Sequence, residues 1–316
     1  MTIEPQGARD AGAQWRRSGT TTWHDSDYTE GAVSAGSITI EFKSISGWTR
    51  PPNQAAWITD GGTTFAAVKY VRTSATSAWK LISTSQPMWR TEHAMAYDSA
   101  RSEIIIFGGK DYNSSALLDD TWIWNGNDWI QKSPNNSPPK RFRHAMTYDS
   151  ARGVVVLFGG LDESSIVFGD TWEWDGSSWT QVSTSGPSPR NNHAMVYDSG
   201  RGMIVLFGGL GGSGDTWEWN GSSWTQVSTS GPSSRWEHAM AYDSARRVVV
   251  LFGGWNSSNL GDTWEWDGNN WNQVSNSGPR ARSEHAIAYD SARGKVVLFS
   301  GTYYVGGGLW SSDKET

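Results

Sequence analysis

The sequence lacks cysteine, long apolar runs and clustered positive charge. With no cysteine in 316 residues, disulfides, thiolate nucleophiles and cysteine-ligated zinc are excluded. No stretch approaches the roughly 18 apolar residues of a membrane span. The 26 Lys and Arg are outnumbered by 32 Asp and Glu, for a net charge of −6, whereas phosphate binding requires clustered positive charge. We therefore expect neither a membrane span nor a nucleic-acid partner.

Glycine and tryptophan are abundant instead, with 36 and 21 residues. Many glycines and aromatics among few charges indicate short strands joined by tight turns, as in an all-β fold. The length suits about two domains. We place them at residues 1–72 and 73–316, because only the second carries an internal repeat.

The repeat opens with His-Ala-Met-Ala-Tyr-Asp-Ser at residues 93–99, and variants of it open at residues 144, 193, 238 and 285. This period is too long for a solenoid coil and suits one four-stranded blade of a propeller. In the second unit the predicted strands span residues 144–148, 154–158, 170–174 and 179–182, with a hairpin signal at Asp175-Gly176.

The second strand of each unit is apolar without alternation, as in the run Val154 to Phe158. Such a strand must be covered on both faces, which radially stacked blades achieve. Tryptophans recur at three positions in the third and fourth strands, and we predict that they form the core between blades. They are Trp122, Trp124, Trp129, Trp172, Trp174, Trp179, Trp217, Trp219, Trp224, Trp264, Trp266 and Trp271.

An apolar strand ending in Gly-Gly, followed by a Trp-bearing strand and a further Trp, resembles the kelch motif. The resemblance covers four full units and a fifth partial one, from about residue 79 to residue 310. It implies a kelch-type β-propeller in which the loops between second and third strands share one face with the inter-blade linkers. Kelch proteins commonly bind partners on that face.

The fifth unit has no fourth strand, and its Gly308-Leu309-Trp310 resembles the start of a third strand. Residues 79–90 match residues 179–190, so the strand at 79–83 is a fourth strand with no blade of its own. Pairing it with the fifth unit would close a ring of five four-stranded blades and remove an exposed edge. The alternative is a truncated ring of six or seven blades.

Residues 1–72 lie outside the repeat. Ser37 to Phe42 alternates apolar and polar residues, as a half-buried strand does, and further strands are predicted at 55–59 and 63–70. The segment resembles a small β-sandwich module of bacterial surface and secreted proteins, which implies a spacer or weak binding module outside the cell. No signal peptide is visible after Met1. The alternatives are therefore a cytoplasmic protein or one piece of a longer precursor.

Every unit is preceded by Arg-x-x-His, which raises two possible sites. Histidines related by rotation suggest a metal ring, but equivalent blade positions lie much farther apart than the reach of metal–nitrogen bonds of about 2.0–2.1 Å. We therefore expect each His to bind backbone between blades, with no metal and no cofactor. The arginines present planar forks that suit carboxylates. We interpret them either as a ligand-binding set or as partners of nearby acids such as Glu92, Glu237 and Glu284.

Aromatic residues in the variable loops break the repeat, so blade packing does not explain them. They suit contacts with sugars or peptides. The predicted ligand-binding residues are the linker arginines and these aromatics: Arg90, Arg141, Arg190, Arg235, Arg282, Tyr112, Phe168, Trp236, Trp255, Tyr303 and Tyr304.

No nucleophile elbow, phosphate loop or metal-ligand cluster indicates catalysis. Galactose oxidase resembles this fold but needs copper and a cysteine cross-linked to tyrosine, which this chain cannot make. Our first hypothesis is a monomeric, non-enzymatic binding module of a bacterial surface or secreted protein, with a glycan or protein ligand. The alternatives are a sugar-processing enzyme resembling kelch-type sialic acid epimerases, and an intracellular kelch interaction adaptor.

Overall fold

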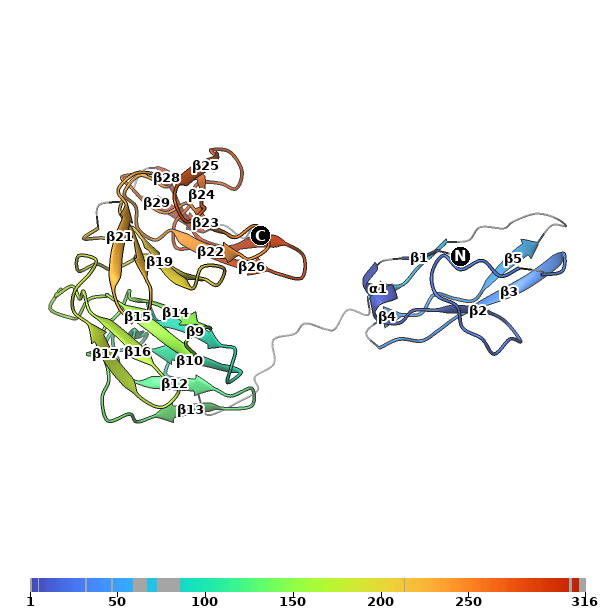
Figure 1. Ribbon diagram of the computed structural model, residues 1–316, viewed down its shortest axis with the longest axis horizontal. Helices are drawn as coiled ribbons and strands as arrows, with labels where there is room; N and C mark the ends of the chain where they lie inside the picture. The colour runs from blue at the N-terminus through green and yellow to red at the C-terminus, as the bar shows by residue number, and fades with distance from the viewer. Residues whose placement is uncertain are drawn as a thin grey trace. The chain divides into compact units, whose positions relative to one another are not determined.

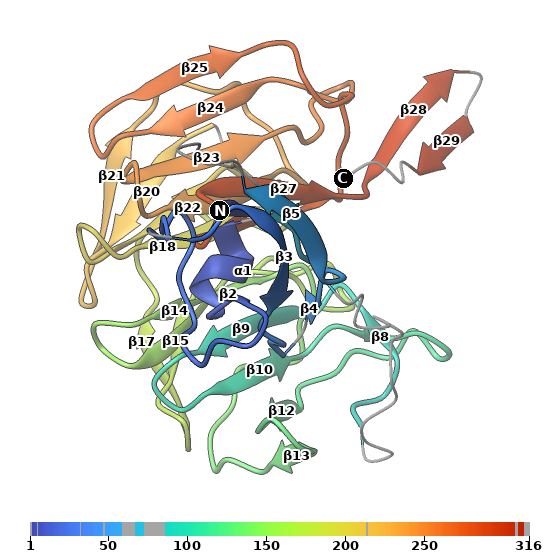
Figure 2. The same cartoon turned by 90° about the vertical axis from the view of Figure 1, so that its right-hand side faces the viewer.

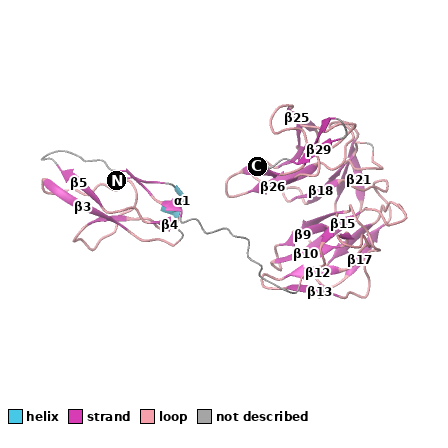
Figure 3. Ribbon diagram, turned by 180° about the vertical axis from the view of Figure 1, so that it is seen from behind, coloured by secondary structure: helices cyan, strands magenta, loops and turns pink. Residues whose placement is uncertain are grey.

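The computed structural model describes residues 2–4, 6–31, 33–46, 48–58, 67–72, 86–212, 214–306 and 309–312. The chain divides into two compact parts, Met1–Leu81 and Ile82–Thr316, called here the N-terminal module and the repeat domain. Strands joined by loops dominate both parts (Figure 3). Within the described residues, no helix has the length and apolarity needed to cross a membrane.

Among its described residues, the N-terminal module contains three small sheets around one core. Strands β2 (Trp15–Arg17), β3 (Gly36–Phe42) and β5 (Gln54–Ile58) form an antiparallel sheet, β1 (Thr2–Glu4) pairs with β6 (Ala67–Lys69), and β4 (Trp48–Thr49) pairs with β7 (Val71–Arg72). Helix α1 spans Gln6–Asp10. Ile40 and Phe42 alternate into the core beside Trp15 and Tyr70, as the sequence of β3 predicts. The β-sandwich itself stays a prediction.

Four repeat units each form a four-stranded antiparallel sheet, and the sheets follow one another in chain order (Figure 1). Unit one contains β9 (Ala94–Asp98), β10 (Glu103–Phe107), β12 (Thr121–Trp124) and β13 (Trp129–Lys132). Unit two contains β14 (Ala145–Asp149), β15 (Val154–Phe158), β16 (Thr171–Trp174) and β17 (Trp179–Ser183). Unit three contains β18 (Ala194–Asp198), β19 (Met203–Phe207), β20 (Thr216–Trp219) and β21 (Trp224–Ser228). Unit four contains β22 (Ala239–Asp243), β23 (Val248–Phe252), β24 (Thr263–Trp266) and β25 (Trp271–Ser275). The predicted all-β propeller architecture is confirmed.

Consecutive units are joined by a packing pattern that repeats. Phe158 of unit two, for example, packs with Leu206 and Trp224 of unit three. The Trp224 Nε1 also donates a hydrogen bond to the Thr171 hydroxyl of unit two at 2.8 Å. The apolar second strand is therefore buried from both sides, which explains why it does not alternate.

A chain of backbone hydrogen bonds links the units where their first strands begin. The residue before each His has a left-handed φ of 55° to 58°. Its N–H donates to the carbonyl oxygen of the equivalent residue in the preceding unit at 2.9–3.0 Å. These residues are Glu92, Arg143, Asn192, Glu237 and Glu284. The same bond recurs at each of the four joints from unit one to unit five.

The Gly-Gly pair after each second strand is required by this joint. Gly159 and Gly160 have φ of +69° and +95°, which glycine adopts without strain. A Cβ on Gly159 would lie 2.5 Å from the Arg190 carbonyl oxygen of unit three. In unit five Ser300 replaces the first glycine, and the described part of the chain contains no sixth unit after it.

Unit five differs from the prediction. Strands β26 (Ala286–Asp290) and β27 (Lys295–Phe299) form a two-stranded sheet. The segment expected to be its third strand lies in β29 (Leu309–Ser312), which pairs with β28 (Thr302–Gly306) and not with β27. This hairpin stands apart from β27 (Figure 2). Strand β28 begins at Thr302, soon after β27 ends, and pairs with β29 in place of β27. The closing strand predicted at residues 79–83 lies outside the described residues.

The repeated tryptophans are not equally buried. The second Trp of strand three is nearly inaccessible in units two to four, where Trp174, Trp219 and Trp266 are at most 1% exposed. Trp217 and Trp264, the first Trp of strand three in units three and four, are only partly buried. The three tryptophans of unit one are also only partly buried. No described repeat unit precedes unit one to cover them.

We expect Trp219→Ala to lower the free energy of unfolding by about 3–5 kcal/mol, the usual cost of truncating a buried aromatic side chain. Trp217→Ala should cost clearly less, because that side chain is already partly solvated. Urea unfolding of the full chain measures both. Equal losses for the two variants would contradict this account of the core.

Candidate functional site

Linkers and variable loops meet at one end of each unit. The linker residue after each Arg bridges the residue that follows Gly-Gly, as in Phe142 with Leu161 and Trp236 with Trp255. The loops between second and third strands therefore lie beside the Arg-x-x-His segments. We call this end the loop face.

The linker arginines are buried and fully bonded. In unit three the Arg190 Nη1 and Nη2 donate to the two carboxylate oxygens of Asp215 at 2.8 and 3.0 Å, and Nη1 also donates to the Gly208 carbonyl oxygen. The Arg190 side chain is 0% exposed. The same fork recurs in Arg90–Asp120, Arg141–Asp170 and Arg235–Asp262.

Each aspartate of these pairs also accepts a hydrogen bond from the first Trp of strand three. The Trp217 Nε1 donates to Asp215 at 2.7 Å, and Trp122, Trp172 and Trp264 bond their aspartates in the same way. Burial by itself would raise the pKa of Asp215, but hydrogen bonds and charge from Arg190 outweigh it and keep that pKa below its usual value. The pair therefore stays ionised and ties each linker to strand three.

The sequence predicts ligand binding by the linker arginines, whereas the structure buries their side chains inside the blades. Their guanidinium groups point into the blades, and four of them are held by aspartates rather than by Glu92, Glu237 or Glu284. Arg282 is also 0% exposed, and it donates to the Ser300 carbonyl oxygen at 2.9 Å. These arginines, which recur once in each blade, therefore stabilise the blade structure.

Four linker histidines, His144, His193, His238 and His285, are buried between units, whereas His93 is only partly buried. Each of the four rings packs edge-on against the phenylalanine that ends the preceding second strand, with centroids 5.3–5.7 Å apart. Burial, together with the charge of the adjacent Arg141, Arg235 or Arg282, lowers the pKa of His144 and of His238 to about 3, and that of His285 to about 4. Across the described ranges, no three His, Asp or Glu side chains are grouped to hold a metal.

The variable-loop aromatics have different environments. Phe168 stacks on the guanidinium of Arg141 at 4.1 Å, so it shields the buried pair and serves the fold. Tyr112 is 66% exposed and packs edge-on against Trp89. Trp236 exchanges backbone hydrogen bonds with Trp255 at 3.2 and 2.8 Å.

Trp255, Tyr303 and Tyr304 line one pocket of about 570 Å³, together with Ser257, Ser258, Asn259, Arg280 and Ala281. The exposed guanidinium of Arg280 lies 3.7 Å from the Tyr303 ring centroid. Asn259 fixes the pocket because its Oδ1 accepts the Tyr304 N–H at 2.8 Å and its Nδ2 donates to the Thr302 carbonyl oxygen at 3.2 Å. We call this site the aromatic pocket.

The sequence interpretation missed Arg280 and Asn259. A signal for Arg280 exists, because it stands two residues before the linker arginine, where units three and four have Ser188 and Ser233. Those serines bond their buried arginines at 3.0 and 3.1 Å. A long cation in place of a small structural hydroxyl departs from the repeat in the same way as the loop aromatics do.

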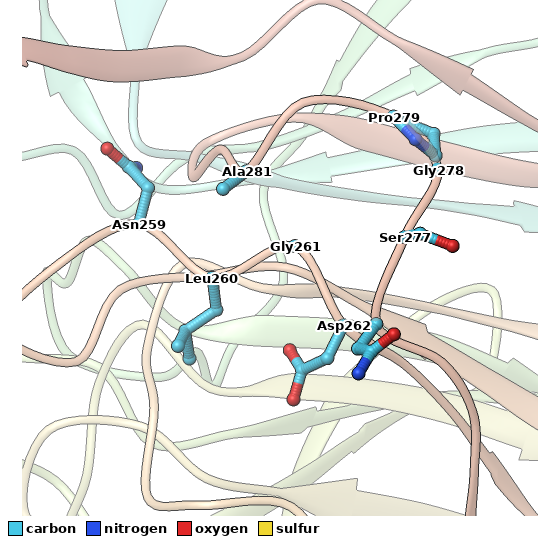
Figure 4. Close-up of a pocket in the computed structure, with 9 residues that line it drawn as sticks. Asn259, Leu260, Gly261, Asp262, Ser277, Gly278, Pro279 and Ala281 are labelled. Atoms are coloured by element: carbon cyan, nitrogen blue, oxygen red, sulfur yellow. The ribbon is translucent and has the colours of Figure 1, made fainter.

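A neighbouring groove shows what the repeat alone produces. Residues 259–262 run beside residues 276–279 and Ala281 (Figure 4), enclosing about 420 Å³. An equivalent groove of about 510 Å³ lies between residues 167–170 and 184–189 of unit two and its linker. These grooves follow from blade geometry. The aromatic pocket is instead lined by residues that break the repeat.

Residues 58–231 match the family model described as the KLHDC2/KLHL20/DRC7 Kelch-repeats domain. The chain belongs to the kelch-repeat family. The predicted resemblance is thereby confirmed, and kelch domains generally bind protein partners. A search among curated proteins found no match. Membership of the kelch family agrees with two features of this chain. The residues that build the blades recur in each unit, whereas the loops on the loop face differ between units.

We expect Arg190→Ala to lower the free energy of unfolding by about 3–5 kcal/mol, because it leaves the Asp215 carboxylate buried without its partner. Arg293→Ala is the matched control. Its side chain is 68% exposed and pairs with Asp290, which is itself 22% exposed, so its loss should cost about 0–1 kcal/mol. Urea unfolding measures both. Similar losses would show that the linker pairs are not structural.

We also expect stability to fall as the pH drops from about 7 to about 5. The unfolded chain takes up protons on histidine near pH 6.5, whereas the buried His144, His238 and His285 stay neutral. More protons are then bound by the unfolded state, so each such histidine removes about 1.4 kcal/mol per pH unit below about 6.5. Glu237 opposes this, because burial and Glu284 raise its pKa and the native state takes up that proton first.

The readout for this pH dependence is urea unfolding at both pH values, in the wild type and in His238→Gln. The variant should lose about 1.4 kcal/mol per pH unit less than the wild type, whatever its own stability. Identical pH slopes in the two proteins would refute the assignment of His238 as a buried neutral group.

Proposed function

We propose that this chain is a non-enzymatic interaction module that binds a protein partner through the aromatic pocket on its loop face. The proposal rests on the observation that several residues outside the repeat meet in one pocket. Trp255, Arg280, Tyr303 and Tyr304 all depart from the repeat, come from the unit-four loop and from unit five with its linker, and line the same pocket.

The chemistry of the pocket supports protein recognition. Tyrosine, tryptophan and arginine dominate the energetically important positions of protein interfaces. Tyr304 is 47% exposed, while Tyr303 lies under the guanidinium of Arg280. That stacking leaves the edge of the fork available for a carboxylate. The volume also lies in the range of about 300–1,000 Å³ usual for ligand pockets.

The enzymatic alternative loses the arginines that partly suggested it. The linker arginines and the nearby glutamates motivated the comparison with sugar-processing kelch enzymes. In the structure four of these arginines are forked onto aspartates, and Arg282 is also 0% exposed. Buried arginines held in this way are poor candidates for contact with a substrate on the loop face.

Glycan recognition is the second candidate, and a specific feature of the pocket favours it. Ser257, Ser258 and Asn259 place hydroxyl and amide groups beside aromatic rings. Sugars are bound by this combination, since apolar ring faces stack on aromatics and hydroxyls bond polar side chains. A glycan ligand would occupy the same pocket as the protein partner, so the two candidates compete for one site.

The deciding experiment presents the purified full chain to a random-peptide display library and to a glycan array. We expect enriched peptides that bind the wild type and bind Tyr304→Ala at least about tenfold more weakly by fluorescence anisotropy. The control is Ile166→Ala, which truncates a side chain that is 59% exposed on the unit-two loop. Both variants should keep the stability of the wild type within about 0.5 kcal/mol.

Enriched glycans sensitive to Tyr304→Ala would support the second candidate instead. Peptide and glycan binding that is absent, or equal in Tyr304→Ala and the wild type, would overturn the assignment of this pocket. An intracellular kelch adaptor would share the peptide result. We propose an extracellular or cell-surface location because of the surface-type character of the N-terminal module. Antibody labelling of intact cells tests the location, and labelling only after permeabilisation would refute it.

A further inference from the structure

Strand β27 of unit five has a free edge among the described residues. In units one to four the second strand is paired on both sides, as β15 is with β14 and β16. Within the part of the chain that the structure describes, strand β27 pairs with β26 alone. An unpaired edge offers a row of backbone donors and acceptors to an added strand.

In the other units, strand three pairs with this edge of the second strand. Strand three has the pattern Thr-Trp-x-Trp in the same register in units two to four, with Leu157 opposite Trp172 and Val156 opposite Glu173 in unit two. A hairpin then leads to strand four. Its Trp reaches back to the Thr of the preceding unit, as Trp271 does to Thr216 at 2.7 Å.

Units four and five contain the residues that contact strands three and four in the other blades. Val296 and Leu298 correspond to Val155 and Leu157, which are 0% exposed, but they are only partly buried. Thr263 corresponds to Thr121, Thr171 and Thr216, whose hydroxyls accept a Trp Nε1 and are at most 1% exposed. Thr263 is partly exposed, and its hydroxyl has no hydrogen bond within the described ranges.

Two segments of this chain are candidates for completing unit five. The fourth strand predicted at residues 79–83 lies outside the described residues, and the candidate for the third strand is engaged elsewhere. Strands β28 and β29 pair with each other, with Tyr303 opposite Ser311. Figure 2 shows this hairpin directed away from β27. Leu309 and Ser311 also stand where the repeat has Thr and Glu, so β29 lacks the Thr-Trp-x-Trp pattern of the strands that pair with second strands in the other units.

We propose that the edge of β27, together with Thr263 on β24, binds a β-hairpin supplied by a partner protein, with a first strand of the form Thr-Trp-x-Trp and a Trp opening the second. Added strands gain main-chain hydrogen bonds for affinity and side-chain pockets for specificity. Here the pockets are defined by Val296, Leu298 and the Thr263 hydroxyl. This hairpin site is separate from the aromatic pocket, and neither proposal depends on the other.

A synthetic peptide with the sequence of residues 262–275 is the probe, because it carries this hairpin from unit four. We expect the fluorescein-labelled peptide to bind the full wild-type chain in an anisotropy titration. Replacing its three tryptophans by serine should weaken binding at least about tenfold. Thr263→Val in the protein should weaken it roughly fivefold, the equivalent of one hydrogen bond.

The matched control is Thr225→Val, which makes the same change at an exposed position of β21. It should leave peptide binding unchanged. The Thr263→Val side chain is close in shape to the original and lies at a partly exposed site, so the variant is expected to fold. Circular dichroism of both variants verifies this before titration.

Because the chain has no cysteine, the register can be tested by a single disulfide. Val156 faces Glu173 and Val250 faces Glu265 in the complete blades, so Val297 should face the equivalent glutamate of the peptide. Val297→Cys should therefore cross-link to a peptide carrying Glu265→Cys. A peptide carrying Asp267→Cys, two residues away on the same face, should react at least about fivefold more slowly.

Binding with this register and this sensitivity supports the proposal. It is overturned if the peptide does not bind, if Thr263→Val binds as the wild type does, or if both cysteine peptides react equally fast.

Discussion

A buried arginine forked onto an aspartate sets the geometry of each complete unit. The arginine ends the linker and the aspartate begins strand three, so the pair clamps together segments that are 25 to 30 residues apart, as in Arg190–Asp215 and Arg90–Asp120. The same guanidinium bonds the carbonyl oxygen of the first glycine after strand two. Once the linker is fixed, the next histidine is placed against the preceding phenylalanine, and only glycine fits at the contact. The Gly-Gly, His and Arg signals are thus parts of one joint.

The sequence predicted the blades well because their determinants are local and repeated. Apolar second strands, the Asp-Gly and Asn-Gly hairpins and the tryptophan pairs each indicate an element without reference to distant residues. Burial of the linker arginines was harder to predict. Arg is usually exposed, and the partner that makes its burial tolerable lies in the third strand. The signal was present nevertheless, since an aspartate precedes Thr-Trp in every unit that has a complete blade.

The candidate site was predicted in part for a related reason. Departure from the repeat identified Trp255, Tyr303 and Tyr304, which the structure brings into one pocket. It also pointed to Phe168, which instead covers the buried Arg141. A departure therefore marks a residue whose surroundings differ between units, and contacts must decide whether that difference serves the fold or a ligand. Arg280 was missed because it lies close to the linker arginine Arg282 and was taken for part of the repeat. Comparison of the units shows that unit three has Ser188 at this position.

The position of the aromatic pocket gives it a particular energetic character. In a repeat protein each unit is stabilised mainly by its neighbours, so a terminal unit lacks one of two joints. Unit five is such a unit within the described chain, and Phe299 is 60% exposed where Phe158 and Phe207 are 0%. The pocket takes its walls from unit four and from unit five with its linker, and Asn259 bridges them. A ligand held by both walls must therefore strengthen the joint between units four and five, and the free energy of binding adds directly to the free energy of docking unit five.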